Sequence, residues 1–403
     1  MKSNRAFVLT AITVIAPFFL QLFYIRYVSY NVDKEIYGNF ILLQTLVVAL
    51  SYVFLQIPTS AYSRFYNEAI DKVSYVNEFR TLLIFINILS FLVIFIFGLI
   101  YLKSSVAILL SLFCFFLLLN NFAFNKEIFL LNLDRRSYLS INILESAAKY
   151  LCPIAGYYLF GTLFAFVMGL VVGYLISFIF LTLKLKDYPF SINFNLKHIK
   201  KYLIYAYPVI ITASLSWGIN LSDRYFIEFF METRDVAIYA ILAQVAGFGS
   251  IVGQIYGMYV NPIMFKKYEE NRTEALLLLE KYIRYLLIVF CLSYTAVLFL
   301  PRSLFTLLVK PEVINNDLYY YSLIILVLSS FLAVAQNAFA MYFTLEKKLK
   351  IITYAYAIAF AANFIGNFYI DSYGIVAASI STLIAFMIIN LVQYLYIKKV
   401  IRP

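Results

Sequence analysis

Twelve apolar stretches, each long enough to cross a bilayer, fill most of this 403-residue chain. A membrane-spanning helix needs about 20 mostly apolar residues, because the hydrocarbon layer is about 30 Å thick. The segments between the stretches are too short to fold as separate soluble domains. The pattern therefore predicts an all-α polytopic membrane protein with twelve transmembrane helices, at 6–29, 39–60, 81–102, 106–128, 139–159, 162–183, 203–226, 236–260, 282–300, 318–343, 351–370 and 374–397.

Composition supports this interpretation. The chain is 64% hydrophobic and 13% charged, whereas a soluble domain carries about a quarter charged residues. The formal net charge of +11 would suggest a nucleic-acid partner in a soluble protein. Here the basic residues lie in short loops between apolar stretches, so membrane topology explains them and no nucleic acid is expected.

Lysine and arginine are distributed unevenly between the two sides of the membrane. One side holds 24 of them, the other holds five, and three more lie inside spans. The positive-inside rule therefore predicts that both termini are cytoplasmic, as an even number of spans also requires. The five outer residues are Lys34, Lys103, Arg234, Arg302 and Lys310, and the three inside spans are Arg26, Lys149 and Arg224.

Cysteine and histidine give no sign of a metal or disulfide site. Cys114, Cys152 and Cys291 all lie within predicted spans, and His198 is the chain's single histidine. No zinc-ligand spacing occurs. We expect no metal, no cofactor and no enzymatic activity.

The chain divides into two similar halves. Asp134-Arg135-Arg136 precedes the fifth span and Glu346-Lys347-Lys348 the eleventh, 212 positions later, and Ile36-Tyr37 matches Ile238-Tyr239 at 202. We expect a six-helix bundle at 1–185, a cytoplasmic connector at 186–201 and a second six-helix bundle at 202–403. Two six-span halves share one orientation, so they would be parallel repeats around a central cavity, as in alternating-access transporters. Chance similarity of hydropathy is the alternative.

Ionisable residues deep in a span are candidates for function, because each costs about 2.5–3.5 kcal/mol at the bilayer centre. Glu145 and Lys149 lie well inside the fifth span and are four residues apart, so they share a helix face and could pair. Lys149 could hold an anionic group, with Glu145 tuning it or exchanging a proton. A neutralised structural bridge is the alternative.

Other charged residues lie nearer the span ends. Lys126 and Glu127 are at the cytoplasmic end of the fourth span, where snorkelling also explains the lysine. Arg26, Asp223 and Arg224 are near the outer ends of the first and seventh spans, which open the two halves. They could line a cationic outer vestibule, with interfacial anchoring as the alternative for Arg26.

Short motifs along the full length resemble those of one transporter family. They are Glu35–Phe40, Ser222–Ile227, Ala237–Ala240, and the turns at Gly161 and Gly374. On these motifs the chain resembles Wzx-type flippases of the polysaccharide transporter family, within the multidrug/oligosaccharidyl-lipid/polysaccharide exporter (MOP) superfamily. The family often has glycine where this chain has Ala237, so that motif is weaker here.

The resemblance implies that the chain moves an undecaprenyl-diphosphate-linked oligosaccharide across a bacterial inner membrane, driven by a gradient of H⁺ or Na⁺. The implied partners are this substrate, membrane lipids, and candidate protein partners such as a polysaccharide polymerase and a chain-length regulator. We assign substrate binding to Lys149, Arg224, Arg26 and Lys126, and ion coupling to Glu145, Asp223 and Glu127. Such cations suit a diphosphate or acidic sugars.

Two other classes of function remain open. A drug or small-cation exporter of the same superfamily should have an acidic cavity without a lysine at mid-membrane. A membrane-embedded polymerase, ligase or acyltransferase usually needs a sizeable outer loop or an intramembrane histidine. The longest outer connector here is roughly 301–317, and His198 lies in a predicted cytoplasmic segment.

Overall fold

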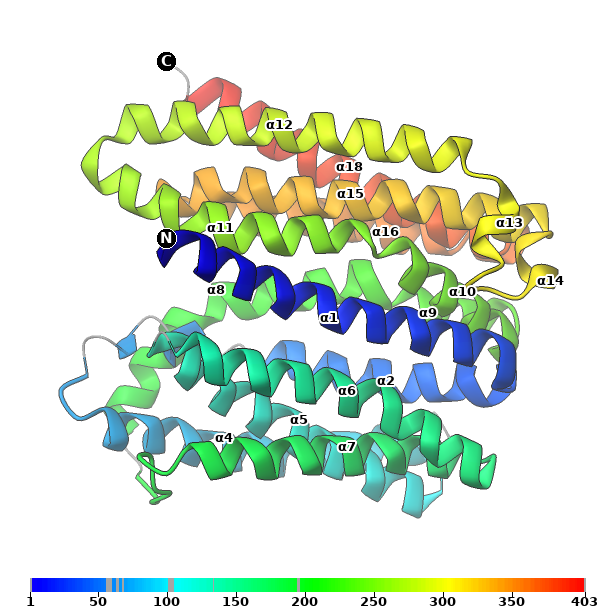
Figure 1. The fold of residues 1–403 in the computed structure, drawn as a ribbon, viewed down its shortest axis with the longest axis horizontal. Coiled ribbons are helices and arrows are strands. Elements are labelled where there is room, and N and C mark those ends of the chain that lie inside the picture. Colours follow the sequence, from blue (N-terminus) through cyan, green and yellow to red (C-terminus); the bar gives the residue numbers. More distant parts are fainter. Residues whose placement is uncertain are drawn as a thin grey trace. The chain divides into compact units, whose positions relative to one another are not determined.

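The computed structural model describes residues 2–55, 60–62, 65–66, 69–100, 105–132, 134–193 and 196–401. In these ranges the regular secondary structure is helical, which confirms the all-α prediction (Figure 1). Lys103 lies outside the described residues. The helices are α1 (Lys2–Asn31), α2 (Lys34–Phe54), α4 (Lys72–Ile100), α5 (Val106–Leu131), α6 (Arg135–Phe160), α7 (Leu163–Lys184), α8 (Leu196–Leu221), α9 (Asp223–Phe230), α10 (Thr233–Ala246), α11 (Gly249–Glu270), α12 (Arg272–Phe299), α13 (Arg302–Phe305), α14 (Pro311–Ile314), α15 (Asp317–Leu345), α16 (Lys350–Asn367), α17 (Ile370–Tyr373) and α18 (Ile375–Tyr396).

Within the described ranges, nine helices are long and apolar enough to cross a membrane, and each coincides with a predicted span. The other three predicted spans are helical but differ in detail. α6 carries Glu145 and Lys149 in its middle. The eighth predicted span is divided between α10 and α11, because α10 ends at Gly247. α16 is short, at 18 residues.

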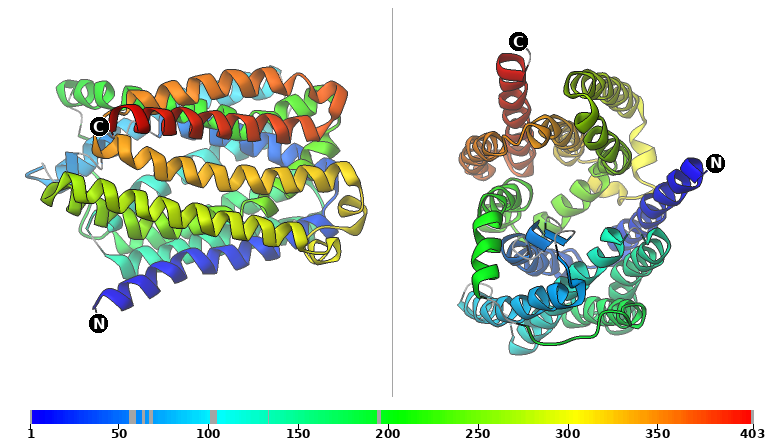
Figure 2. Two further views of the ribbon diagram at one scale, coloured as in Figure 1. Left: turned by 90° about the horizontal axis from the view of Figure 1, so that it is seen from above. Right: turned by 90° about the vertical axis from the view of Figure 1, so that its left-hand side faces the viewer.

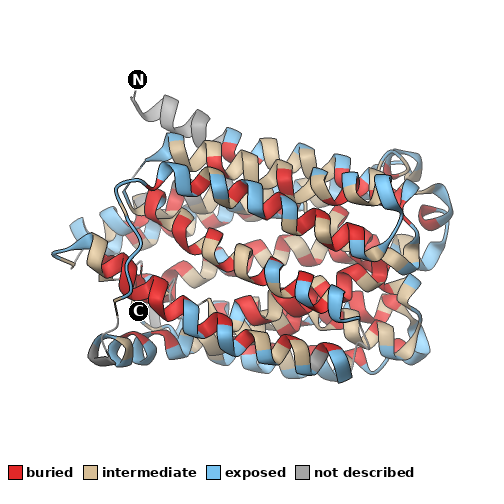
Figure 3. Ribbon diagram, turned by 90° about the horizontal axis from the view of Figure 1, so that it is seen from below, coloured by how far each residue is buried: buried red, intermediate tan, exposed pale blue. Residues whose placement is uncertain are grey.

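The outer surface of α4 shows why such helices suit a lipid environment. Phe85, Ile88, Leu92 and Ile96 follow one another at helical spacing and are 53–60% exposed. A continuous exposed apolar stripe of this kind is unfavourable in water and favourable against lipid tails. Single helices carry both buried and exposed residues along their length (Figure 3).

Short polar residues begin several helices, and glycine ends others. The Oδ1 atom of Asp33 accepts hydrogen bonds from the backbone N–H groups of Glu35 and Ile36, at 2.9 and 3.1 Å. Such caps satisfy donors that the first turn leaves open. Gly161 and Gly374, both predicted to lie in turns, have φ of 63° and 60°, a region in which a side chain is strained.

The helices form two compact units. Unit 1 comprises Met1–Phe18, Ile25–Gly38 and Leu215–Pro403, and unit 2 comprises Phe19–Tyr24 and Asn39–Ser214. The second half of the sequence is thus joined in unit 1 by segments of α1 and the start of α2. The division into two six-helix bundles with a connector at 186–201 stays a prediction.

In unit 1, α15 packs against α10, α11, α12 and α18, while α16 packs against α18. These helices run alongside one another in the views of Figures 1 and 2. One cluster of its core joins the end of α8 to α16 and α18 through Ile219, Tyr356 and Phe386. This packing holds the α8–α9 junction in place.

In unit 2, α6 packs closely on α7 because the facing positions are small. A Cβ atom added to Gly169 would lie 2.5 Å from the Cys152 carbonyl oxygen, and one added to Gly173 would lie 2.6 Å from that of Ala148. Ala148 and Cys152 therefore face α7. This contact fixes the rotation of α6 about its axis and so decides where its charged residues point.

The segment after α7 is fastened to α4. Asn77 donates from Nδ2 to the Pro189 carbonyl at 3.0 Å, and Arg80 donates from NH1 to the Tyr188 carbonyl at 2.8 Å. Arg80 also donates to Oδ1 of Asn125 at 2.8–3.0 Å. The hydrogen bonds of the buried guanidinium thus go to neutral acceptors. The first residues of the predicted connector are bound to α4 of unit 2 by these contacts.

Candidate functional site

The polar residues of α6 form one stripe. Tyr138, Asn142, Glu145 and Lys149 follow at intervals of four, three and four, so they share a face. Ala148 faces α7, and helical geometry places the stripe on a neighbouring face. α6 therefore presents a row of polar groups rather than a single ionised residue.

Lys126 of α5 contacts two of these four residues. Its Nζ donates to Oε2 of Glu145 at 2.5 Å and to Oδ1 of Asn142 at 3.3 Å. The two charged side chains are only 14% and 17% exposed. The prediction that Glu145 pairs with Lys149 is wrong, because packing of α5 on α6 brings a lysine from another helix to the carboxylate.

Lys149 is left without this partner. Its Nζ lies 5.3 Å from the ring centroid of Tyr150, and within the described residues it makes no ion pair. The Tyr150 ring in turn lies 5.4 Å from that of Tyr24. Glu127 likewise makes no ion pair in the part of the chain that the structure describes, although it is close enough to Lys126 to act on it electrostatically. Lys149 is partly exposed, so its ammonium group is not enclosed by the residues around it.

Asp223 lies in unit 1, where the predicted seventh span is interrupted. α8 ends at Leu221 and α9 begins at Asp223, so the helix breaks at Ser222. The Asp223 side chain is 1% exposed. Its Oδ2 accepts a hydrogen bond from the Tyr239 hydroxyl at 2.5 Å, whereas Oδ1 is buried with no partner. An unsatisfied carboxylate oxygen at a helix break is a ready acceptor for a proton or small cation.

Other unsatisfied polar atoms belong to the same region. The Nε atom of Arg224 and the hydroxyl of Thr382 are buried without a hydrogen bond. The Thr382 side chain, on α18, lies beside the Tyr239 hydroxyl. The described residues contain no group of three or more His, Cys, Asp or Glu that could hold a metal ion.

Arg26 contacts the segment 302–310, and no contact in the described part of the chain supports the predicted vestibule. Its NH1 donates to the Leu307 carbonyl, and its guanidinium lies 5.2 Å from the Tyr30 ring centroid. Tyr30 donates to the Thr306 carbonyl, and the Lys310 N–H donates to Oγ of Ser29 at 3.0 Å. Among the described residues, no hydrogen bond or ion pair joins Arg26 to Asp223 or Arg224. The end of α1 is instead fastened to the segment 302–310, and the vestibule stays a prediction.

Tyr239 is the residue of this site that the sequence did not single out. It lies in the motif Ala237–Ala240, and its partner lies in the motif Ser222–Ile227. The repeat-matched Tyr37 is also buried and accepts a hydrogen bond from Nε2 of Gln244 at 2.8 Å. The recurrence of Ile-Tyr in both halves could have marked this tyrosine as a site residue, but it does not reveal which carboxylate the tyrosine contacts.

Comparison with known proteins identifies the fold. The sequence matches no protein-family model and no curated protein. Among solved structures, it is similar to lipid II flippase MurJ in an inward closed conformation, with TM-score 0.77 and 17% identity over 97% of this chain and 87% of that one. A multidrug resistance MATE family transporter of the MOP superfamily in an inward-facing conformation matches with TM-score 0.70 and 14% identity, over 97% of both chains.

A MOP superfamily transporter from Pyrococcus furiosus matches with TM-score 0.67 and 16% identity, over 98% of this chain and 95% of that one. These solved proteins are described as transporters and a flippase. The chain is a multi-pass membrane protein with the fold of the MOP superfamily.

Proposed function

We propose that this protein is a flippase that translocates undecaprenyl-diphosphate-linked oligosaccharides across the bacterial inner membrane by ion-coupled alternating access. The observation that carries this proposal is Lys149. It is an ammonium group in the middle of α6, which we predict to be the fifth span, and its expected counter-ion Glu145 is bound by Lys126 instead. A cation without a carboxylate partner favours an anionic substrate group such as a diphosphate. The fold shared with lipid II flippase MurJ is in keeping with a lipid-linked substrate.

Asp223 is the best candidate for ion coupling. A carboxylate that is 1% exposed, with one oxygen hydrogen-bonded and the other unpartnered, can bind H⁺ or Na⁺ in exchange for a conformational change. Arg224, next in the chain, has a buried Nε without a partner. Substrate contact by Arg224 and Arg26 and ion coupling by Glu127 stay predictions. For Lys126 and Glu145, predicted to bind substrate and to couple the ion, we now propose that their ion pair supports the α6 stripe.

We expect the orientation from the charge pattern of the sequence and the partners from the family resemblance. The excess of Lys and Arg on one side favours cytoplasmic termini. The expected partners are the lipid-linked substrate, membrane lipids, the coupling ion, and a polysaccharide polymerase with its chain-length regulator.

The proposal is tested by depleting the protein in its own cell and locating the lipid-linked oligosaccharide. We expect it to accumulate in the cytoplasmic leaflet, where an impermeant glycosidase cannot reach it in spheroplasts, while surface polysaccharide is lost. Accumulation in the outer leaflet would instead indicate a polymerase or ligase.

A drug or cation exporter is the second candidate, because Asp223 is an acidic interior group of the kind that binds cations. The two readings differ at Lys149. An exporter of cations should tolerate its neutralisation or be improved by it, whereas a flippase should lose activity.

A further inference from the structure

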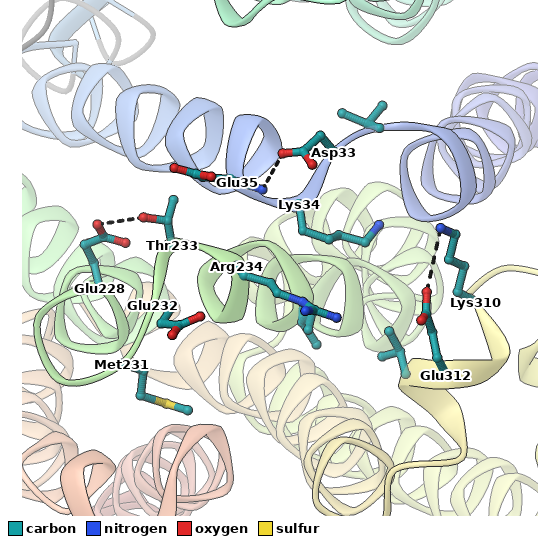
Figure 4. A pocket seen from close by; sticks show the side chains of 13 residues that line it. Asp33, Lys34, Glu35, Glu228, Met231, Glu232, Thr233, Arg234, Lys310 and Glu312 are labelled. Carbon is teal, nitrogen blue, oxygen red and sulfur yellow. Dashed lines mark hydrogen bonds and ion pairs between the residues drawn. The ribbon is translucent and has the colours of Figure 1, made fainter.

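One end of unit 1 contains a pocket of about 670 Å³ that no step of the proposed transport cycle uses. It is formed by the turn between α1 and α2, the end of α9, the start of α10 and the segment 310–313 (Figure 4). Its volume is in the range of small-molecule sites. Three of the chain's five predicted outer cations line it, namely Lys34, Arg234 and Lys310.

Of the three cations that line the pocket, two have partners among the described residues. Lys34 donates to the carbonyls of Val28 and Ser29 at 3.2 and 2.6 Å, so it caps the last turn of α1. Lys310 lies 3.7 Å from Glu312, a loose ion pair. Arg234 points into the pocket in Figure 4 and has no ion pair within the described residues.

The acidic part of the pocket lies around Glu228. Its Oε1 accepts a hydrogen bond from the Thr233 hydroxyl at 2.9 Å, and its Oε2 is buried without a partner. Burial, with the nearby charge of Glu35, raises the pKa of the Glu228 carboxyl, and the Thr233 hydrogen bond opposes the shift. Glu232 adds a further exposed carboxylate. These groups would gain from an ammonium partner.

The walls of the pocket are held rigidly. Asp33 is fixed as the cap of α2. A Cβ atom at Gly38 would lie 2.0 Å from the Thr233 carbonyl oxygen, so α2 and α10 meet backbone to backbone beside the pocket. The backbone that carries these side chains is therefore held in place before a ligand binds.

Charge balance then selects the ligand. Five carboxylates and three cations line the pocket, so a simple anion would meet net repulsion, whereas a simple cation would leave Arg234 without a counter-ion. The carboxylates are Asp33, Glu35, Glu228, Glu232 and Glu312. A ligand with both charges satisfies both ends. We propose that this pocket binds a zwitterionic phosphoethanolamine group, with its phosphate at Arg234 and its ammonium at Glu228 and Glu232.

This inference goes beyond the proposed flippase activity and does not depend on it. The group could come from a phosphatidylethanolamine headgroup or from a soluble or sugar-borne phosphoethanolamine. Both present a phosphate and an ammonium two carbons apart, so the recognition chemistry is shared.

The test is equilibrium binding to the purified full chain in detergent. The probes are glycerophosphoethanolamine, glycerol 3-phosphate as its anionic half and ethanolamine as its cationic half. We expect the zwitterion to bind about tenfold or more tightly than either half. Arg234→Gln and Glu228→Gln should each weaken it about tenfold, as when a charge-assisted hydrogen bond is lost. Arg302→Gln is the matched control, because Arg302 pairs with Asp317 and does not line the pocket.

Glu228→Gln keeps an acceptor for Thr233, and Arg234 is exposed, so neither change should disturb folding. Absence of saturable zwitterion binding overturns the proposal. So does equal affinity for glycerol 3-phosphate together with no effect of Glu228→Gln, which would indicate a simple anion site. Nanodiscs separate the two sources. Loss of probe binding in phosphatidylethanolamine discs relative to phosphatidylglycerol discs assigns the site to the headgroup, and unchanged binding assigns it to the soluble or sugar-borne group.

Discussion

The Tyr239 hydroxyl donates a hydrogen bond to Oδ2 of Asp223 across 2.5 Å, while Oδ1 of the same buried carboxylate has no partner. The two residues come from separate sequence motifs, one at the α8–α9 break and one in α10. One oxygen of the carboxylate is thus held by Tyr239, and the other is buried without a hydrogen bond. This is the arrangement expected of a group that binds and releases a cation or proton during a cycle.

Asp223→Asn should therefore abolish ion-driven transport while leaving the protein abundant in the membrane, since the neutral amide still accepts from Tyr239. Tyr239→Phe should retain the carboxylate but remove the hydrogen bond from the tyrosine hydroxyl, at a cost of about 1–3 kcal/mol in stability. Transport against imposed H⁺ and Na⁺ gradients, with thermal unfolding in detergent, separates the two effects. Normal gradient-driven transport by Asp223→Asn would remove this residue from the coupling step.

Lys126 and Glu145 should behave as a structural pair. Glu145→Gln leaves the Lys126 ammonium, 14% exposed, without its counter-ion, and should lower the free energy of unfolding by about 1–3 kcal/mol. The double variant Lys126→Gln/Glu145→Gln should recover most of this loss, as thermal unfolding would show. Lys149→Gln is the comparison on the same helix, and its stability should be nearly unchanged. If Lys149→Gln destabilises as much as Glu145→Gln, the two residues are coupled after all.

These residues also show what the sequence can and cannot predict. Apolar length was enough to locate the helices, because lipid requires each span to satisfy its own backbone hydrogen bonds. Spacing put Glu145 and Lys149 on one face correctly but could not show that α5 brings Lys126 to that face. Arg26 was placed near the end of its helix, yet its bond to the Leu307 carbonyl depends on a segment 281 residues away. Contacts between distant segments are set by packing, which local patterns do not contain.

The carboxyl of Glu346 should make stability depend on pH. Hydrogen bonds from Arg272 first, and from Tyr268, hold the pKa of the Glu346 carboxyl below its usual range despite partial burial. A lowered pKa in the folded state stabilises the protein above the unfolded pKa of about 4.3, and this contribution is lost as pH falls through the folded value. Glu346→Gln should thus be less stable at pH 7 and lose less stability on acidification. Asp187→Asn, at an exposed site, is the control, and equal acid sensitivity of Glu346→Gln and the native protein would contradict this role.

The orientation can be checked with exposed positions at the two ends. In a protein whose Cys114, Cys152 and Cys291 are replaced, single cysteines at Asp187 and Thr273 should be protected from an impermeant thiol reagent in intact spheroplasts. Cysteines at Asn315 and Ser372 should be labelled. All four positions are exposed, so protection reports the membrane side rather than burial. Labelling of cysteines at Asp187 and Thr273 from outside would contradict the predicted orientation.

The central claim is tested most directly by translocation in proteoliposomes. The purified protein is reconstituted with an undecaprenyl-diphosphate-linked oligosaccharide, an H⁺ or Na⁺ gradient is imposed, and the fraction reached by an external glycosidase is followed in time. We expect gradient-dependent translocation that falls about tenfold or more in Lys149→Gln, as for loss of a charge-assisted contact, and partial activity in Lys149→Arg. Absence of translocation by the native protein, or an unchanged rate in Lys149→Gln at equal reconstitution, would contradict the assignment of an anionic lipid-linked substrate to this site.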